Sequence, residues 1–194
     1  MAQPFTDAQR DAIRHRLLES ARRHAISDGP QKTSLDTLTS EAGISKSSFY
    51  KFYETKEQLF LEVSAMWETQ VIDASMRALA GLPSKSSKER AAAFVFTAFE
   101  QIHQLGIVRF LREDLPQLSA SIPADIARQH YISSASGIFF ALREAGIRFT
   151  EPDDIVLSVV QLMYLSILNI QDIGDTFFPA LRTLVESACE RLVA

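Results

Sequence analysis

Residues 33–60 read TSLDTLTSEAGISKSSFYKFYETKEQLF. Two short helical segments, 34–42 and 45–51, lie on either side of Gly43. Glycine readily adopts the left-handed conformation that ends a helix, and a serine such as Ser45 is a typical N-cap for the next one. The spacing therefore predicts a helix-turn-helix motif.

The second of these segments has the chemistry of a recognition helix. Its first turn, Ser45-Lys46-Ser47-Ser48, is short, polar and cationic, so little bulk separates it from a base edge in a major groove. Tyr50 can place its hydroxyl on a phosphate. Lys56 stands in the first turn of the following helix, where a cation opposes the helix dipole unless a phosphate lies nearby. The pattern predicts DNA binding.

The rest of the chain indicates a helical globular protein. Hydrophobic residues make up 46% and charged residues 23%, with only seven glycines and seven prolines among 194 residues. The net charge is −4, but the first sixty residues hold nine Lys/Arg against eight Asp/Glu, which directs a polyanion to that part. The lone cysteine, Cys189, fits a reducing cytoplasm, and the N-terminus shows no signal-peptide pattern.

Helix-capping residues, helix-ending Gly and Pro residues and the spacing of apolar positions predict an all-α chain of about nine helices. The expected ranges are 6–27, 34–42, 45–51, 55–79, 86–105, 107–114, 121–145, 152–173 and 179–192. We expect a three-helix DNA-binding domain over 1–54 and a larger helical domain over 55–194. The apolar segment 155–170 is shorter than a membrane span and is interrupted by polar residues, so we expect a buried helix and no membrane partner.

The stretch quoted above resembles the DNA-binding signature of the TetR family of bacterial transcriptional regulators. The matching positions are Thr33, Ala42-Gly43-Ile44-Ser45, Tyr50 and Thr55-Lys56-Glu57-Gln58-Leu59, and the resemblance covers about residues 13–63. The sequence departs from the family pattern at three positions. Ser47 stands where glycine is common, Phe52 where histidine is common, and Thr39 where alanine is frequent.

The resemblance implies an all-helical homodimer that binds a palindromic operator and holds a ligand in its larger domain. It implies phosphate contacts for Thr33, Tyr50 and Lys56, and base-facing or flanking roles for Lys51 and residues 45–48. The full set of expected DNA-binding residues is Thr33, Ser34, Ser45, Lys46, Ser47, Ser48, Tyr50, Lys51 and Lys56.

Aromatic residues and methionines are frequent after residue 60. For most of them the ordinary interpretation is core packing, but an apolar pocket with a few polar groups is how small molecules are usually held. As ligand-binding candidates we take Trp67, Phe99, Phe110, Phe139 and Met163.

The last two helices, at about 153–173 and 177–193, are expected to form the homodimer interface. The segment 155–170 is apolar almost all round, and a monomer could not cover both of its faces. Pairing with the same helices of a second copy would bury the exposed side in a four-helix interface.

Other function classes fit the sequence less well. There is no Gly-rich phosphate loop, HExxH or G-x-S-x-G pattern, so no catalytic residues and no enzyme are predicted. One cysteine and four histidines without paired spacing predict no metal and no cofactor. A non-specific DNA-binding protein should be basic, and a helical protein-interaction module leaves the Ser/Lys/Tyr turn without a role. We therefore expect a ligand-responsive regulator, a repressor released by a small and largely apolar effector.

Overall fold

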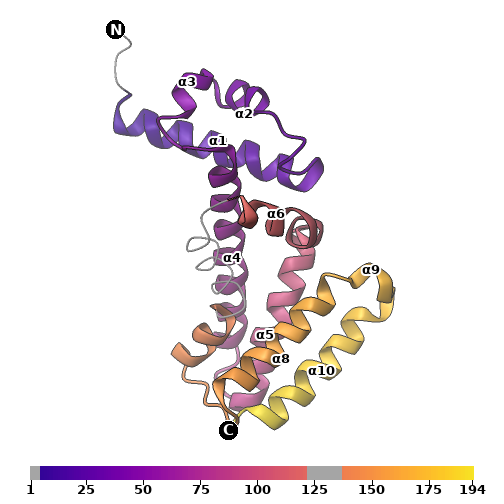
Figure 1. The fold of residues 1–194 in the computed structure, drawn as a ribbon. Coiled ribbons are helices and arrows are strands. Elements are labelled where there is room, and N and C mark those ends of the chain that lie inside the picture. The colour runs from indigo at the N-terminus through magenta and orange to yellow at the C-terminus, as the bar shows by residue number, and fades with distance from the viewer. Residues whose placement is uncertain (1–4, 122–136) are drawn as a thin grey trace. The chain divides into compact units, whose positions relative to one another are not determined.

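The computed structural model describes residues 5–121 and 137–194, and every regular element in these ranges is helical (Figure 1). An isolated antiparallel bridge joins Phe149 to Val193, and no strand occurs in the described part of the chain. The all-α prediction is confirmed. The elements are α1 (Asp7–Ser27), α2 (Leu35–Ala42), α3 (Lys46–Phe49), α4 (Lys56–Ala80), α5 (Ser87–Gln104), the π-helical turn η1 (Phe110–Asp114), α6 (Leu115–Ala120), α8 (Asp153–Ile167), α9 (Ile170–Ile173), the 3-10 turn η2 (Gly174–Thr176) and α10 (Phe177–Leu192).

Side-chain caps explain why the helices begin where they do. The hydroxyls of Thr6, Ser34, Ser45 and Ser86 each accept a hydrogen bond from a backbone N–H in the first turn of the helix that follows. At Ser86 the cap is reciprocal, because Glu89 accepts from the Ser86 backbone N–H at 3.0 Å. Such caps satisfy N–H groups that have no partner inside the helix. The predicted helix starts at these four positions are confirmed.

Two predicted helices end at other residues than expected. The segment 107–114 was expected to stop at Leu115-Pro116, but a π turn leads directly into α6. In a regular α-helix the Pro116 ring would clash with the carbonyl four residues earlier, and the wider turn lies immediately before it.

The predicted helix 152–173 is divided into α8 and the short α9. Near the break the Ser166 hydroxyl donates to the Met163 carbonyl at 2.6 Å, and the Asn169 amide donates to the Leu165 carbonyl at 2.9 Å. Such side-chain bonds to nearby carbonyls compete with the helical ladder. The predicted helix 121–145 lies largely outside the described residues. The part of it that the structure describes is helical over residues 137–144.

The described residues form two compact units, which we treat separately. The first contains the residues through Met66 together with those from Arg109 to residue 121, and the second contains Trp67–Val108 and residues 137–194. The division within α4 concerns packing, and the functional boundary after residue 54 stays a prediction.

The core of the first unit is built by the inner faces of α1 to α4. Leu17 from α1, Leu38 from α2, Phe49 from α3 and Leu59 from α4 are all fully buried. Helices α2 and α3, with eight and four residues, are too short to be stable alone, so burial against the other helices supplies most of their stability.

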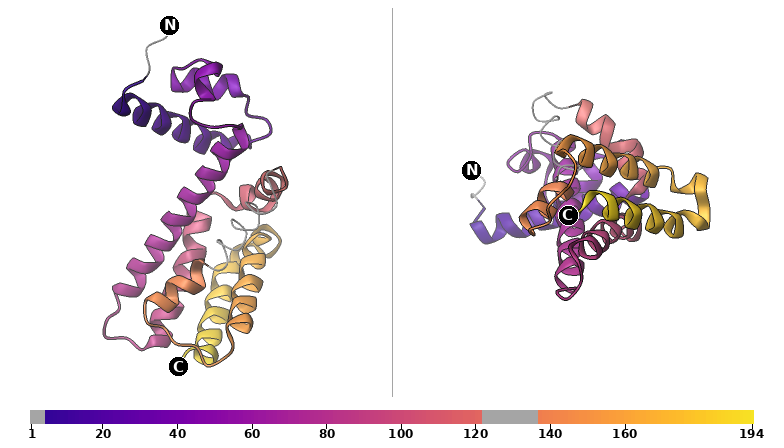
Figure 2. Two further views of the ribbon diagram at one scale, coloured as in Figure 1. Left: turned by 60° about the vertical axis from the view of Figure 1, so that its left-hand side comes forward. Right: turned by 90° about the horizontal axis from the view of Figure 1, so that it is seen from below.

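In the second unit α10 packs against α5 and runs beside α8 (Figure 2). Val160 and Met163 of α8 are buried, whereas Leu162 on the opposite face is 66% exposed. The helix thus has an inner and an outer apolar face, as its sequence indicated. Among the described residues no single helix is long and apolar enough to cross a membrane. Helix α8 and the segment Ile170–Leu192 together have sufficient length and apolar composition, but the chain bends by 69° between them.

Candidate nucleic-acid interface

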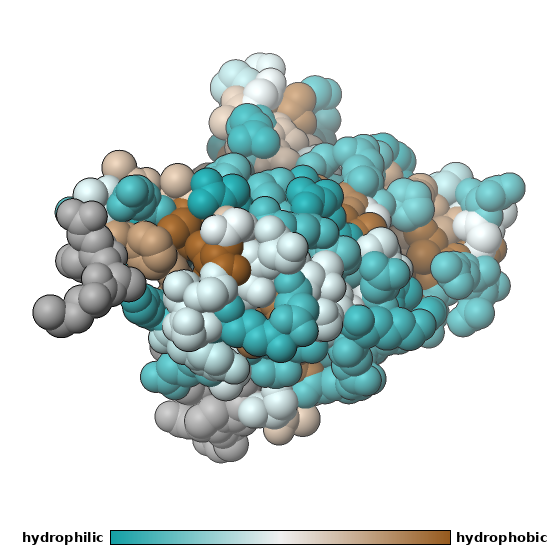
Figure 3. All heavy atoms as spheres, turned by 90° about the horizontal axis from the view of Figure 1, so that it is seen from above, coloured by the Kyte–Doolittle hydropathy of each residue, from teal (hydrophilic) through white to brown (hydrophobic). Residues whose placement is uncertain are grey.

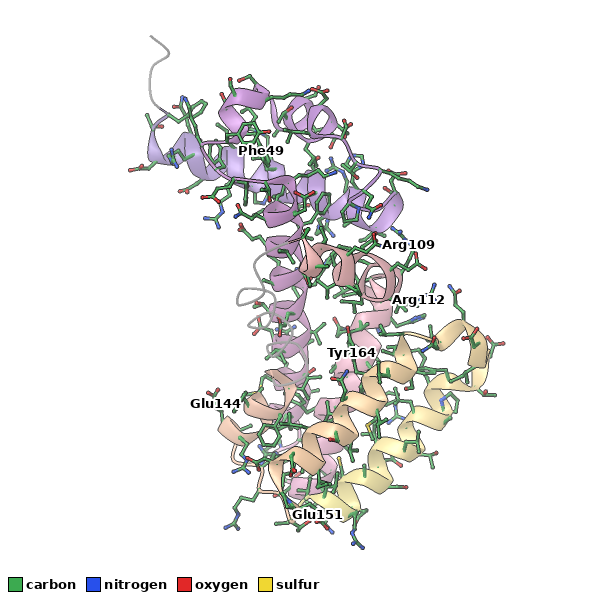
Figure 4. The ribbon with its side chains drawn as sticks, in the orientation of Figure 1. Phe49, Arg109, Arg112, Glu144, Glu151 and Tyr164 are labelled. Atoms are coloured by element: carbon green, nitrogen blue, oxygen red, sulfur yellow. The ribbon has the colours of Figure 1, made fainter. Side chains whose placement is uncertain are left out.

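Helices α2 and α3 form a compact helix-turn-helix held against α1. Gly43 takes the left-handed conformation, with φ +69°, and the Ile44 N–H donates to the Thr39 carbonyl at 3.0 Å. Phe49 points inward from α3 and is fully buried (Figure 4). The inward ring leaves the first turn of α3 on the outside, which is the arrangement that a recognition helix requires.

The first turn of α3 presents hydroxyl groups to the solvent. The Ser45 hydroxyl lies 2.9 Å from that of Ser47 and 3.0 Å from that of Ser48, and it caps the helix. Ser45 and Ser47 are exposed and Ser48 is half-buried. Hydroxyls can donate and accept, so this cluster can meet either type of base-edge group.

Tyr50 follows directly and is the most exposed ring near this turn, with 60% of its surface accessible. It packs edge-on against the buried Phe49 ring, with 5.6 Å between the centroids. The contact fixes the base of the Tyr50 side chain and leaves its hydroxyl in solvent. The face that carries α2 and α3 is predominantly hydrophilic (Figure 3).

The two lysines of this region are engaged differently. Lys46 forms an ion pair with Asp36 of α2 at 2.8 Å, and both side chains are more than half exposed. Lys51 is exposed, and its ammonium nitrogen lies 5.3 Å from the centre of the Phe5 ring. An exposed ion pair contributes little free energy, so Lys46 can leave Asp36 for a phosphate at small cost.

Thr33 and Lys56 hydrogen-bond to backbone carbonyls of the loop between α1 and α2. Thr33 is 3% exposed, and its hydroxyl donates to the Gly29 carbonyl at 2.8 Å. The Lys56 ammonium donates to the carbonyls of Pro30 and Thr33, both at 2.8 Å. Both side chains thus stabilise the loop between α1 and α2, whose carbonyls have few other partners. Their contacts with phosphate stay predictions, and the Ser34 hydroxyl caps α2 from an exposed position.

A network centred on Glu41 fixes α2 to α1. The Glu41 carboxylate accepts from Ser20 at 2.6 Å and from Arg23 at 2.8 Å, and its second oxygen lies 3.0 Å from His24. The hydrogen bond from Ser20, followed by that from His24, lowers the pKa of Glu41 to about 2. The bond to Glu41 raises the pKa of His24, with a smaller contribution from Asp28.

A second network ties the segment after α5 to the end of α1, within the first unit. The Arg109 guanidinium donates to the carbonyls of Ala25 and Ile26 at 2.9 and 3.3 Å, in the last turn of α1 (Figure 4). Asp114 is 8% exposed and lies 3.4 Å from Arg109, and burial raises the pKa of its carboxyl. A Cβ at Gly29, where φ is +87°, would lie 3.1 Å from the Asp114 carboxylate.

Sequence reasoning did not find Arg109 or Asp114. They are more than eighty residues from the helix that they contact, and no local pattern marks such a pairing. Gln117, which hydrogen-bonds Gln31, adds a third contact of the same kind. The segment 109–117 therefore belongs to the structure that positions α1 and the start of α2.

The five ligand-binding candidates are divided between the two units, and their role in ligand binding stays a prediction. Phe110 belongs to the first unit, whereas Trp67, Phe99, Phe139 and Met163 belong to the second. Each of the five is at least nine-tenths buried. Phe139 stacks on Phe149 with 5.4 Å between the centroids. Of the five, Met163 lines an apolar cavity of the second unit.

An apolar cavity of about 30 Å³ lies in the second unit, and residues of α5, α8 and α10 contribute to its wall. Val95, Phe149, Val160, Met163 and Cys189 are among the lining residues. This volume is about that of one water molecule and is far below the several hundred Å³ of a typical ligand pocket. Burial raises the pKa of the Cys189 thiol to about 11, so the reactive thiolate is scarce. Among residues 5–121 and 137–194, no group of His, Cys, Asp and Glu is placed to hold a metal ion.

Comparison with known proteins agrees with this geometry. Residues 17–63, from the middle of α1 into α4, match the family model described as bacterial regulatory proteins, tetR family. None of the curated proteins is significantly similar in sequence.

Solved structures share the fold over nearly the whole chain. A TetR-family transcriptional regulator from Mesorhizobium loti MAFF303099 superposes with a TM-score of 0.63 at 19% identity and 96% coverage of both chains. One from Shewanella sp. PV-4 gives 0.64 at 17% identity, covering 94% of this chain and 98% of that one. The regulator FadR from Bacillus subtilis, solved in complex with stearoyl-CoA, gives 0.60 at 12% identity, covering 90% of this chain and 96% of that one.

Proposed function

We propose, from its membership of the TetR family of bacterial regulatory proteins, that this DNA-binding transcriptional regulator acts as a homodimeric repressor on a palindromic operator. The observation that supports the proposal best is the geometry of α3, whose buried Phe49 turns a polar first turn and the exposed Tyr50 outward. We assign the chain no catalytic role and place it in the cytoplasm, where its DNA is.

Sequence readout in this proposal depends on the hydroxyls of the α3 turn. Ser47 is exposed and has no bulk beyond its hydroxyl, so a base edge can approach the helix closely. Tyr50 and Lys46 supply phosphate contacts on either side of it. Phosphate contacts fix the register on DNA, and the base contacts then provide the specificity.

The outer faces of α8 and α10 support the homodimer. Ile155, Leu162 and Leu165 of α8 and Leu184 of α10 are between 45% and 66% exposed. A palindromic operator requires two recognition helices related by a two-fold axis, and a second copy seated on these faces would supply the second one. The occupant that we propose is therefore another copy of this chain.

Sedimentation of two variants tests the dimer. Leu162→Glu places a charge in the proposed interface, and we expect monomers at micromolar concentration. Ile26→Glu is the matched control, because Ile26 is also exposed, at 37%, but lies in the first unit. A wild-type monomer, or a Leu162→Glu dimer as stable as the control, would refute this interface.

For the effector we propose a largely apolar molecule that enters the second unit at the cavity beside Met163 and Cys189. The cavity wall is apolar, and its present volume requires side chains of α8 and α10 to move apart when a ligand enters. The stearoyl-CoA bound to the structural neighbour makes long acyl chains the first class to test. The test adds saturated fatty acids and acyl-CoA of graded length to the protein–DNA complex and follows release. Val160→Leu, whose one added methylene group occupies the cavity, should weaken the response and leave DNA binding intact.

Selection of bound duplexes from a random pool tests the DNA-binding proposal itself. We expect enrichment of an inverted repeat, and we expect Tyr50→Phe to weaken binding to every selected duplex. A non-specific DNA-binding protein would enrich no sequence, and a protein-interaction module would retain no DNA. Transcription from a promoter that carries the selected repeat would then separate repression from activation.

A further inference from the structure

We infer that Arg10, together with Lys51, forms a second phosphate-binding site beside α3 that extends the protein's grip on the DNA backbone. The inference rests on the proposed function, since it concerns the same duplex. It adds the first turns of α1 to an interface that otherwise consists of α2, α3 and the start of α4.

Arg10 is held beside the end of α3 by two contacts, one with a backbone carbonyl and one with an aromatic ring. Its guanidinium donates to the Lys51 carbonyl at 3.4 Å, and its central carbon lies 5.2 Å from the centre of the Phe52 ring. The Phe52 ring packs against Phe5 with 6.1 Å between the centroids. The Lys51 ammonium lies over that second ring. Two cations thus lie over one pair of rings that contact each other at a tilt of 40°.

Neither cation forms an ion pair with a carboxylate among residues 5–121 and 137–194, unlike several cations nearby. Both line a surface hollow of about 360 Å³, together with Asp11, Arg14 and Glu62. Glu62 is already engaged, because it accepts from Arg14 at 2.8 Å and from the Tyr53 hydroxyl at 2.9 Å. Asp11 is the other carboxylate that lines the hollow, and its single negative charge does not balance the two positive charges of Arg10 and Lys51. The rim of the hollow therefore has an excess of positive charge.

A phosphate of the DNA backbone is the ligand that this arrangement fits. The guanidinium of arginine presents a rigid fork that matches a phosphate, and seating it on a ring limits the freedom that binding would otherwise remove. Lys51 follows directly after the exposed Tyr50, so the hollow that the two cations line borders the exposed surface of α3. A strand already lying across α3 would therefore pass this site.

The salt dependence of duplex binding tests the inference. Each phosphate contact contributes about 0.9 to the slope of log affinity against log salt concentration. We expect Arg10→Gln to lower the slope by about one and to weaken binding to specific and unrelated duplexes equally, whereas Arg10→Lys retains most of the slope. Lys51→Gln should act in the same direction. The matched control is Lys85→Gln, which removes the same charge from an exposed lysine of the second unit.

Urea unfolding distinguishes a lost DNA contact from a misfolded variant. Because Arg10 and Lys51 are exposed, their substitution should leave the unfolding midpoint near that of the wild type. If the wild type binds duplexes and both Gln variants keep its slope, this inference is overturned and the proposed function stands. If the wild type binds no duplex, the proposed function fails and the inference fails with it. A slope change in Lys85→Gln equal to that in Arg10→Gln would likewise overturn it, since overall charge alone would then explain the effect.

Discussion

Lys56→Ala should destabilise the first unit, because the Lys56 ammonium donates to the carbonyls of Pro30 and Thr33, both at 2.8 Å. Hydrogen bonds from a charged donor contribute about 1.5–3 kcal/mol each, and partial exposure of this group favours the lower figure. The cation also opposes the dipole of α4, which costs about 0.3–1 kcal/mol. Together these values predict a loss of about 2 kcal/mol in the free energy of unfolding.

Urea unfolding followed by far-ultraviolet circular dichroism measures this loss. Lys32→Ala is the control, because Lys32 is an exposed lysine in the same loop and forms no hydrogen bond or ion pair with another described residue. A lysine that served only as a phosphate contact would behave like Lys32, within about 0.5 kcal/mol of the wild type. Equal stability of the two variants would therefore refute the structural role of Lys56. Weaker DNA binding by Lys56→Ala is expected from either role and does not separate them.

Three further results are expected. The free energy of unfolding of the first unit should fall by about 0.5–1 kcal/mol as pH rises through the raised pKa of His24. Only the protonated ring pairs with ionised Glu41. The stabilisation is therefore complete below the pKa of His24 in the unfolded chain, about 6.5, and is lost above the raised pKa of the folded state. His24→Gln should remove this pH dependence, and a dependence unchanged in that variant would contradict the assignment. Gly29→Ala should cost at least about 1 kcal/mol more than Gly43→Ala in urea unfolding, since φ is positive at both positions but only at Gly29 would the new Cβ meet other atoms within 4 Å; equal losses would argue against the tight packing. Tyr50→Phe should weaken duplex binding several-fold at unchanged stability, because its side chain is 60% exposed, and unaltered affinity would remove Tyr50 from the interface.

The sequence predicted the helix starts well because each depends on neighbours only a few residues apart. Ser34, Ser45 and Ser86 cap helices through bonds that span three residues, and Gly43 takes its left-handed turn for local steric reasons. The sequence of α8 also indicated one buried and one exposed apolar face, since these faces follow from the helical repeat.

Features that depend on distant parts of the chain could not be predicted in this way. The sequence shows that Lys56 opposes a helix dipole, but not that two loop carbonyls about twenty-five residues earlier accept hydrogen bonds from its ammonium group. Arg109 and Asp114 meet the end of α1 only through the tertiary fold. Residue type alone does not identify a ligand pocket, because a ring that lines a pocket and a ring that fills a core have the same local sequence pattern, and all four aromatic candidates are buried.

The central claim is that two copies of α3 read a two-fold DNA site, and the spacing of the half-sites tests it most directly. Duplexes selected from a random pool by the full chain should contain an inverted repeat whose half-site centres are one helical turn, or a whole number of turns, apart, about 34–36 Å per turn. Inserting five base pairs between the half-sites should then abolish tight binding, and inserting ten should partly restore it. Recovery of a single unrepeated motif, or binding that ignores the five-pair insertion, would contradict the account.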